Sequence, residues 1–357
     1  MGEIKYAKYN NYNFVVVSTY CLCTRNNQNR IQDRQIEIQM IKIGITGGLG
    51  FIGSNLASRL IGQNYELVVV DDLSTGLKAN LPNIGYLDYR TSILNDFELT
   101  KALSDCAVIV HLAARGSVPR SLENPVATHE VNSTGTLKVL EIARKNGAHI
   151  IYSSSSSVYG ENDAIPKNEK MWLAPKSPYA ASKLSAESYV QSYAHSFGIP
   201  VTNLRFFNVY GPKQRPNHQY AAVVPKWIWK AINGHAIDVY GDGTQTRDFT
   251  FVGTVVDIIE QAITNRVLTK SAVNVAYGNN ISLLEVIEQI KKYFPNLTYN
   301  FLESRVGDIK NSQNDPALIN ELFPSVKPID FSTGLEKTIN WLKGENIDSN
   351  PLNLDLE

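Results

Sequence analysis

Residues 41–60 read IKIGITGGLGFIGSNLASRL, and this stretch decides the fold. Residues 41–46 form an apolar run rich in β-branched side chains, which is typical of a buried parallel strand. Gly47, Gly50 and Gly53 follow as GxxGxxG, before the helical run SNLASRLIGQ. In such a turn the first glycine permits the bend, the second lets a pyrophosphate approach the backbone, and the third allows close helix–strand packing. The stretch therefore predicts a dinucleotide whose phosphates lie at the helix N-terminus.

A second predicted strand, residues 66–70, ends in Asp71 and Asp72. An acidic side chain at this strand end bonds the ribose hydroxyls of adenosine and repels a 2′-phosphate. The sequence therefore favours NAD over NADP as the cofactor.

Further strands are predicted at residues 84–89, 107–111, 149–154 and 201–206, with helical runs between them. This alternation predicts an α/β fold: a Rossmann-like, doubly wound parallel sheet with its ligand at the carboxyl ends of the strands. His111 ends one strand and is interpreted as a core histidine. The small residues after it would let the backbone lie against the cofactor.

The chain divides into segments of different character. Residues 1–39 are rich in Asn, Gln and Tyr and are interpreted as an N-terminal extension of uncertain order. Residues 40–207 are predicted to form the NAD-binding domain, to which residues 246–280 return. Residues 208–345 are predicted to form mainly a smaller mixed α/β lobe that closes over the substrate, and residues 346–357 a solvated tail.

Composition excludes several classes of protein. The 357 residues include 34 Lys plus Arg and 34 Asp plus Glu, which gives no support for binding nucleic acid or an anionic membrane. No apolar run reaches the roughly 18 residues that indicate a membrane span. Three cysteines fit a reducing compartment, so we expect a cytoplasmic protein. Cys21 and Cys23 form a CxC pair without a second ligand pair, and no metal site is expected.

The pair Tyr179 and Lys183 lies near the start of the helical run SPYAASKLSAESYVQSYAHSFG. Residues four apart share one helix face. An ammonium there would lower the pKa of the phenol from its usual value of about 10 and make it a base for a sugar hydroxyl. The serine run 153–157 follows a predicted strand, so its hydroxyls are expected to line the same crevice.

These motifs together resemble the extended short-chain dehydrogenase/reductase superfamily, and within it the UDP-glucose/UDP-N-acetylglucosamine 4-epimerase group. The resemblance covers roughly residues 40–340. It rests on TGGLGFIGS, DDLSTG, HLAA, NSTGT, SSSSSVYG, SPYAASK, FFNVYGP, GDGTQTRDF and RVGDI.

The resemblance implies roles for individual residues. Tyr179 would be the base, Lys183 its electrostatic partner, and Ser155 the catalytic hydroxyl. NAD would be held by Gly47, Gly50, Phe51, Ile52, Gly53, Asp71, Asp72, Leu73, Ser74, Thr75, Gly76, Ser92, Ile93, Leu112, Ala113, Ala114, Asn132, Tyr179, Lys183 and Phe207. The substrate would be held by Ser117, Ser155, Ser156, Asn208, Val223, Tyr240, Arg247, Arg305, Asp308 and Ser312. Ser92 departs from the Asp that the family often has there.

The expected activity is NAD-dependent 4-epimerisation of a UDP-sugar through a transient 4-keto sugar. Related dehydratases carry an Asp-Glu pair after the catalytic hydroxyl, and related decarboxylases usually keep the Glu; both positions are serine here, Ser156 and Ser157. The alternatives are a UDP-glucuronate 4-epimerase, another nucleotide-sugar reductase or dehydratase, and an inactive NAD-binding scaffold.

Two further expectations concern the substrate and the assembly. In the family, enzymes that act only on UDP-glucose and UDP-galactose tend to have a bulky Tyr four residues after the aspartate of the RxGD motif. Ser312 occupies that position, so the N-acetylated sugars are expected to fit, and residues 116–121 resemble the loop of hexosamine-preferring relatives. A homodimer is expected, because in relatives the helix that carries the Tyr and the helix before it (roughly residues 126–145) pack against their copies.

Overall fold

The structure, a computed structural model, describes residues 5–9, 12–16, 40–216, 221–304 and 310–344. Its strands are β1 (Lys5–Tyr9), β2 (Tyr12–Val16), β3 (Ile41–Thr46), β4 (Tyr65–Val70), β5 (Leu87–Tyr89), β6 (Val108–His111), β7 (His149–Ser155), β8 (Val201–Phe206), β9 (Asn208–Tyr210), β10 (Ile237–Tyr240), β11 (Thr246–Arg247), β12 (Phe249–Phe251), β13 (Val273–Val275), β14 (Ile281–Ser282) and β15 (Tyr299–Leu302). Its α-helices are α1 (Phe51–Leu60), α2 (Asp96–Leu103), α3 (Val118–Glu123), α4 (Pro125–His129), α5 (Gly135–Asn146), α6 (Pro178–Phe197), α7 (Val223–Ile232), α8 (Val252–Thr264), α9 (Leu283–Lys291), α10 (Ala317–Leu322) and α11 (Phe331–Gly344). Shorter turns are η1 (Lys78–Asn80), the π-helical η2 (Glu130–Thr134) and η3 (Ser156–Tyr159).

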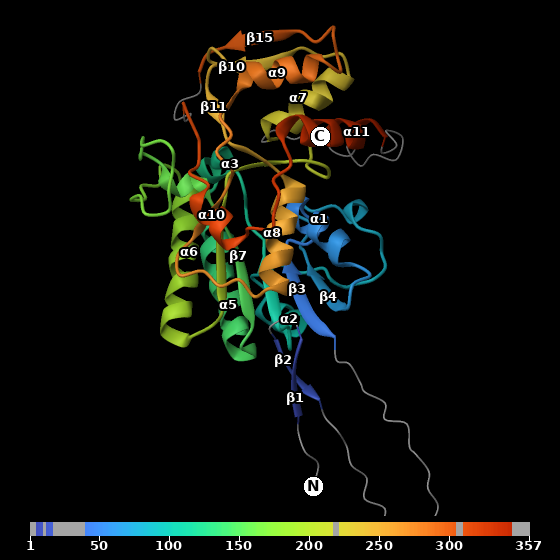
Figure 1. Cartoon of the computed structure of the whole chain (residues 1–357), viewed down its shortest axis with the longest axis vertical. Coiled ribbons are helices and arrows are strands. Elements are labelled where there is room, and N and C mark those ends of the chain that lie inside the picture. Colours follow the sequence, from blue (N-terminus) through green and yellow to red (C-terminus); the bar gives the residue numbers. More distant parts are fainter. Residues whose placement is uncertain (1–4, 10–11, 17–39, 217–220, 305–309, 345–357) are drawn as a thin grey trace, which may run out of the picture.

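Seven parallel strands form the central sheet, in the order β13-β8-β7-β6-β3-β4-β5. The chain starts at β3, adds β4 and β5 on one side, and then crosses to add β6 on the other. The strand order therefore reverses between β3 and β6, and in such sheets ligands bind at the carboxyl edge of this point. The predicted doubly wound α/β fold is confirmed (Figure 1).

Helices cover both faces of the sheet. Ile43 and Ile45 of β3 belong to a core shared with α1 and α8. Val68 and Val70 of β4 belong to the other core, shared with α2, α5 and α6. Strands that are buried on both faces need near-continuous apolar sequence, and this explains the runs recognised at β3 and β4.

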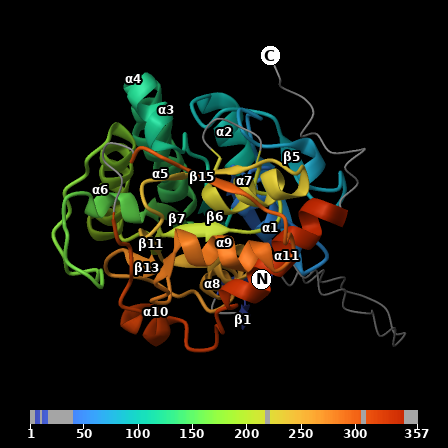
Figure 2. The ribbon, with the colours of Figure 1, turned by 90° about the horizontal axis from the view of Figure 1, so that it is seen from above.

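A smaller group of elements lies above the carboxyl edge of the sheet (Figures 1 and 2). It contains α7, α9, α11 and the parallel pair β10–β15. Its core is continuous with the α1–α8 side of the sheet. The chain crosses between the two parts several times: β9 pairs with β12, α8 packs on α1, and β13 joins the sheet beside β8.

Four elements in three parts of the chain differ from the sequence prediction. The strand expected at residues 84–89 is limited to Leu87–Tyr89, because Gly85 turns at φ +82° and Ile84 is 71% exposed. Helix α1 begins inside the glycine motif at Phe51, earlier than the predicted run. In the extension, β1 and β2 pair antiparallel, although no regular element was predicted there.

Cys21, Cys23 and the predicted tail 346–357 lie outside the described residues. Within the described residues, no helix is long and apolar enough to cross a membrane, and no three His, Cys, Asp or Glu side chains group as a metal site would require.

Candidate active site

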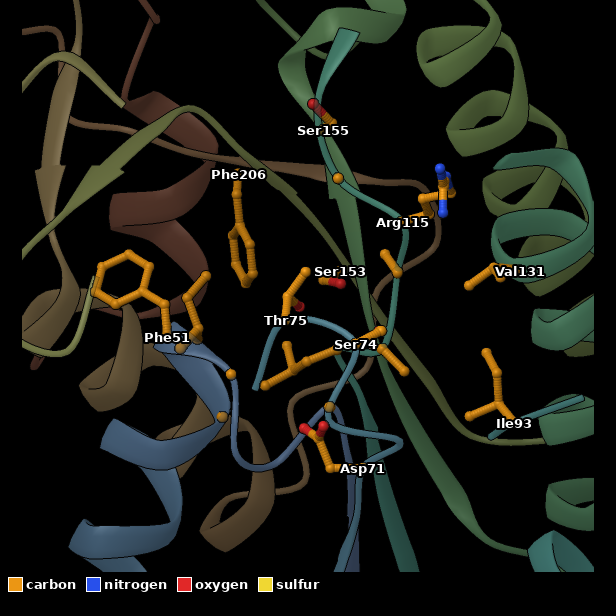
Figure 3. Close-up of a pocket in the computed structure, with 18 of the residues that line it drawn as sticks. Phe51, Asp71, Ser74, Thr75, Ile93, Arg115, Val131, Ser153, Ser155 and Phe206 are labelled. Carbon is orange, nitrogen blue, oxygen red and sulfur yellow. The ribbon is translucent and has the colours of Figure 1, made fainter. Parts of the chain in front are cut away.

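A cavity of about 670 Å³ opens at the carboxyl edge of the sheet, where the strand order reverses (Figure 3). Most of the predicted cofactor residues line it, and so do all three predicted catalytic residues. The predicted residues along its wall are Gly47, Gly50, Phe51, Ile52, Gly53, Asp71, Asp72, Ser74, Thr75, Ile93, Leu112, Ala113, Ala114, Ser155, Tyr179, Lys183 and Phe207.

The glycine turn between β3 and α1 tolerates no side chain at two positions. Gly47 has φ +68°, and a Cβ atom on it would lie 2.8 Å from the backbone nitrogen of Ala113. A Cβ atom on Gly53 would overlap the carbonyl oxygen of Gly47. The third glycine therefore allows the helix to approach the turn itself, whereas the sequence pattern predicted that it permits close helix–strand packing.

Asp71, at the end of β4, holds this turn in place. Its carboxylate accepts hydrogen bonds of 2.9 Å from the backbone nitrogens of Leu49 and Leu73. Burial raises the pKa of Asp71, and those two backbone bonds oppose the rise. Gly76 packs directly on this carboxylate, since a Cβ atom there would lie 2.5 Å from Oδ1. The loop after β4 is thus built around Asp71.

Asn132 anchors the opposite wall from the π-helical turn η2. Its Oδ1 accepts from the backbone nitrogen of Arg115 at 2.7 Å, and its Nδ2 donates to the Arg115 carbonyl and, at 2.9 Å, to Ser182 Oγ. Ser182 in turn donates to the carbonyl of Tyr179. Asn132 therefore joins the loop after β6 to the helix that carries Tyr179, without lining the cavity itself.

His111 lies beneath this wall as an uncharged core residue. Its ring nitrogens bond Thr46 Oγ1 at 2.7 Å and Thr136 Oγ1 at 2.9 Å. Complete burial lowers its pKa to about 3. This surrounding agrees with the structural role that the sequence suggested.

Tyr179 and Lys183 lie one turn apart on α6, which Ser177 caps and Gly198 ends. The phenol of Tyr179 is hydrogen bonded to Ser155, the last residue of β7. Burial raises the pKa of Tyr179, and the Ser155 bond opposes the rise. The expected lowering of this pKa by Lys183 is therefore wrong for the isolated chain.

Lys183 makes its contacts elsewhere, which explains the difference. Its Nζ donates to the carbonyl of Ser153 at 2.8 Å and lies 5.2 Å from the centre of the Tyr152 ring. The side chain is only 4% exposed, and this burial lowers its pKa to about 8. The ammonium is held at the cavity wall by the strand end beside Ser155.

Several predicted residues lie outside the cavity wall: Leu73, Gly76, Ser92, Asn132, Ser117, Ser156, Asn208, Val223, Tyr240, Arg247 and Ser312. Ser92 Oγ accepts from the backbone nitrogen of Leu94, which occupies its hydroxyl within its own loop. Ser117 caps α3 by accepting from the nitrogen of Arg120, and its own backbone has φ +100°.

Three of the predicted substrate residues lie on adjoining segments. Asn208 bonds the carbonyl of Asp248 through its backbone nitrogen and its side chain, each at 3.3 Å. Arg247 Nη1 donates to the carbonyl of Thr246 at 2.8 Å, and the backbone nitrogen of Ser312 donates to the same carbonyl at 3.2 Å. Val223 and Tyr240 begin α7 and end β10 in the smaller lobe. Arg305 and Asp308 lie outside the described residues.

The cavity wall also contains residues that were not named individually as site residues from the sequence: Val70, Thr91, Arg115, Gly116, Arg120, Val131, Ser153, Ser154, Phe206, Val209 and Gln214. Ser153 and Ser154 belong to the serine run that was expected to line the crevice, and Gly116 and Arg120 belong to the loop 116–121 that resembles the loop of hexosamine-preferring relatives. Phe206 adjoins the predicted Phe207, so its position carried a usable signal. Arg115 follows HLAA directly, and its Nε is buried without a hydrogen-bond partner among the described residues. Gln214 lies in an irregular segment where sequence offers no register.

The glycine turn exposes backbone without side chains, and the acidic residue Asp71 lies beside it at the end of β4. A dinucleotide requires this arrangement. Residues 43–276 match the model of a protein family that is described as the NAD-dependent epimerase/dehydratase family. The chain belongs to this family.

Relatives and solved structures of the family match most of the chain. A putative UDP-glucose 4-epimerase of Methanocaldococcus jannaschii is 33% identical over 85% of this chain and 98% of its own length. The UDP-N-acetylglucosamine 4-epimerase of Methanobrevibacter ruminantium M1, solved with UDP-N-acetylmuramic acid, is 34% identical with a TM-score of 0.80, over 85% of this chain and 99% of that one. The UDP-glucuronic acid 4-epimerase of Bacillus cereus, solved with UDP-glucuronic acid and NAD, is 31% identical with a TM-score of 0.78 over the same shares.

Family membership confirms the predicted family, enzyme class and cofactor: the protein is an isomerase of this family that uses NAD. The residues present fit that cofactor. The glycine turn leaves room for phosphates at the start of α1, and Asp71 and Asp72 line the cavity where a 2′-phosphate would be repelled.

The buried Lys183 predicts a dependence of stability on pH. Its pKa is about 8 in the folded chain and 10.5 ordinarily, so between these values the unfolded chain binds the additional proton. Stability then rises with pH, because the uncharged amine costs less to bury. The free energy of unfolding of the parent minus that of Lys183→Met should increase by on the order of 3 kcal/mol between pH 8 and 10.5. Urea unfolding of NAD-free protein measures this; a constant difference would contradict it.

Proposed function

We propose that the protein is a UDP-sugar 4-epimerase that acts on UDP-N-acetylglucosamine and UDP-N-acetylgalactosamine, alongside the plain hexoses. The observation that carries epimerisation is that, among the described residues, no acidic side chain lines the cavity at the Ser155–Tyr179 pair. Among the described residues that line the cavity, the only acidic ones are Asp71 and Asp72. Asp71 lies at the end of the cavity opposite Ser155 (Figure 3). Water elimination needs an acid and a base at the sugar, and the serines of η3 supply neither.

Tyr179 and Ser155 would hold and move the proton of the sugar O4. Their hydroxyls are already hydrogen bonded, so a proton can pass from the sugar through Ser155 or directly to the phenol. When bound, NAD supplies the acceptor and donor of hydride at C4 and brings a positive charge to the site. Both that charge and the Lys183 ammonium would lower the pKa of Tyr179 and so oppose the effect of burial, which raises it. The small residues Ala113 and Ala114 let the backbone lie close to the cofactor.

The smaller lobe would bind the diphosphate. Arg247 lies there, beside the segment that carries Ser312, and Arg305 and Asp308 are further candidates from sequence. Guanidinium groups bond phosphate oxygens in a forked geometry. Binding energy from the diphosphate would then orient a sugar that makes few contacts itself.

The N-acetylated sugars are proposed because Ser312 is small. Its segment pairs with Thr246, next to Arg247, and a phenol ring in its place would fill the space that an acetamido group needs. The similarity to a UDP-N-acetylglucosamine 4-epimerase supports the same choice. A cytoplasmic location stays a prediction from cysteine content alone.

Tyr179→Phe should keep the fold and the bound NAD but lower kcat by 100-fold or more, because only the titratable hydroxyl is removed. The measurement is interconversion of UDP-sugars by purified protein without added NAD, with NAD content determined after denaturation. Tyr293→Phe, in the smaller lobe, is the matched control. A Tyr179→Phe rate close to that of the parent would show that another group is the base.

Ser312→Tyr should lower kcat/KM for UDP-N-acetylgalactosamine selectively, by about 10-fold or more, because the ring would clash with the acetamido group. Progress curves with UDP-galactose, UDP-N-acetylgalactosamine and UDP-glucuronate measure the ratios, and Ser332→Tyr on the exposed face of α11 controls for the added ring. The proposed specificity fails if the parent converts UDP-galactose but not UDP-N-acetylgalactosamine. Conversion of UDP-glucuronate alone would favour the uronate epimerase instead.

We also propose a homodimer formed through α6 and the helical stretch before it, residues 126–145, with α3 beside them. Helices α3, α4 and α6 contact one another and expose Leu122 (65%), Val126 (67%) and Tyr189 (41%). Exposed apolar side chains on adjoining helices support an interface there. Light scattering at micromolar concentration should give twice the chain mass of 39.7 kDa. Val126→Glu should halve that mass, whereas a monomeric parent would refute the proposal.

A further inference from the structure

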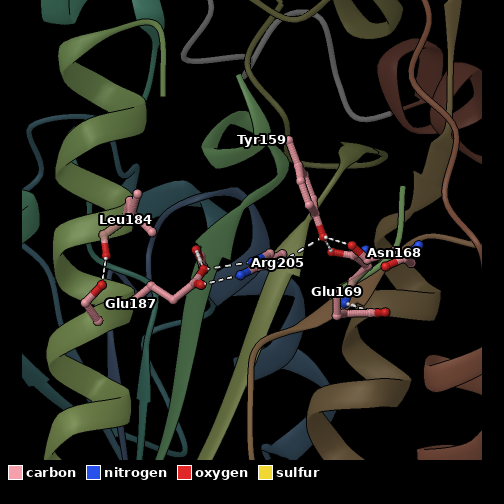
Figure 4. A network of polar contacts seen from close by, with 9 residues as sticks. Tyr159, Asn168, Glu169, Leu184, Glu187 and Arg205 are labelled. Carbon is pink, nitrogen blue, oxygen red and sulfur yellow. Dashed lines mark hydrogen bonds and ion pairs between the residues drawn. The ribbon is translucent and has the colours of Figure 1, made fainter. Parts of the chain in front are cut away.

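A buried ion pair, Glu187 and Arg205, joins α6 to β8 (Figure 4). Glu187 and Arg205 are 5% and 4% exposed. The guanidinium grips the carboxylate with two hydrogen bonds, Nε to Oε2 at 3.0 Å and Nη2 to Oε1 at 2.5 Å. Burial alone would lower the pKa of Arg205, but the bonds and charge of Glu187 outweigh it and raise the pKa, so the guanidinium stays charged.

The carboxylate of Glu187 also joins two strands of the sheet to α6. Its Oε2 accepts from Ser154 Oγ at 2.6 Å. Ser154 of β7 and Arg205 of β8 are register partners, so one carboxylate holds both strands at the same level. Ser154 lines the cavity, and so does the next residue on each strand, Ser155 and Phe206. The two strands are therefore fixed at the level where they reach the cavity.

The same helix face carries the catalytic groups. Tyr179, Lys183 and Glu187 follow one another at intervals of four residues on α6. Each contacts the end of β7: Tyr179 bonds Ser155, Lys183 bonds the carbonyl of Ser153, and Glu187 bonds Ser154. Three successive residues of one strand thus meet three successive turns of one helix.

The network continues toward the smaller lobe. Arg205 Nη1 donates to Tyr159 Oη at 2.9 Å, and Tyr159 donates to Asn274 Oδ1 at 2.8 Å. Asn274 donates to Asn314 Oδ1 at 2.8 Å, two residues after Ser312. Arg205 is therefore supported on its far side and cannot move without disturbing these bonds.

We propose that Glu187 and Arg205 are positioning residues for the reaction: their ion pair fixes the carboxyl end of β7, and with it Ser155, against the helix that carries Tyr179 and Lys183. This inference rests on the proposed function only in the identity of the base. A displacement of about 1 Å at reacting groups costs on the order of 100-fold in rate. An ion pair with two hydrogen bonds resists displacement of the strand end better than an apolar contact does, because an apolar contact has no preferred direction.

The test compares the holoenzyme with Glu187→Gln, Arg205→Lys and the apolar pair Glu187→Leu/Arg205→Met. The first two keep the shape but weaken the forked bond. The double variant removes both charges, which often preserves the fold where removal of one partner does not. The measurements are kcat and KM per NAD-containing subunit across pH, and the titration of the Tyr179 phenol, taken as the difference in absorbance at 295 nm between each protein and its Tyr179→Phe counterpart.

The matched control is Thr202→Val. Thr202 bonds His149 at 2.7 Å and so joins the same two strands at their opposite, amino end. Its removal weakens the same strand pair at a distance from the site. It should lower the unfolding midpoint and leave kcat and the Tyr179 titration unchanged.

We expect all three network variants, the double variant included, to lower kcat by about 10- to 100-fold with KM changed less than about 3-fold, and to shift the Tyr179 titration. A double variant that folds and has both parental kcat and parental titration would overturn the inference, because the pair would then serve stability alone. A parent with no activity on any UDP-sugar, combined with a shifted titration in the variants, would refute the proposed function and leave the positioning role standing.

Discussion

The close approach of Gly53 to Gly47 is the constraint on which the rest of the site depends. A side chain at either position would meet backbone, so α1 can begin at Phe51 and aim its first turn into the cavity. The turn also touches Ala113 after β6, which brings together the two strands between which the sheet order reverses. Asp71 then fixes the turn from the β4 side through Leu49. In the proposed cofactor half of the site, binding would therefore depend on backbone shape.

The proposed catalytic half is built differently, from buried hydrogen bonds between α6 and the end of β7. Asn132 and Ser182 fix α6 to the loop after β6, and Lys183 fixes it to the Ser153 carbonyl. Buried polar groups are stabilising only when every partner is satisfied, and they then admit one arrangement. Backbone shape suffices to hold a large, invariant cofactor, whereas proton transfer needs two hydroxyls at a fixed distance.

The sequence predicted the features that depend on spacing within one segment. It did not predict the features that depend on contacts between distant segments. The glycine turn, Asp71 and the Tyr179–Lys183 pair each follow from spacing within one segment, and the structure brings them to one cavity. The partner of Lys183 could not be predicted, because Ser153 lies thirty residues away and presents only a carbonyl group. The rise in the Tyr179 pKa was missed for the same reason: burial is a property of the assembled fold, and a charge four residues away is not its main determinant. The short β5 was overpredicted since apolar residues such as Ile84 also occur in exposed turns.

One face of helix α6 therefore buries two charged side chains in different ways. Lys183 is charged only against the cost of burial, which lowers its pKa, whereas Glu187, one turn later, is neutralised by Arg205. If both sites were neutral and apolar, the helix would pack at least as stably on β7, since buried pairs seldom add net stability. The presence of the Glu187–Arg205 pair near Tyr179 is then explained by its directional hydrogen bonds. These bonds hold the end of β7 in one position, where a hydrophobic contact would allow it to slide. Lys183 has no ion-pair partner among the described residues, so its ammonium remains available to a negative charge on the neighbouring phenol. A carboxylate paired with it would remove that availability.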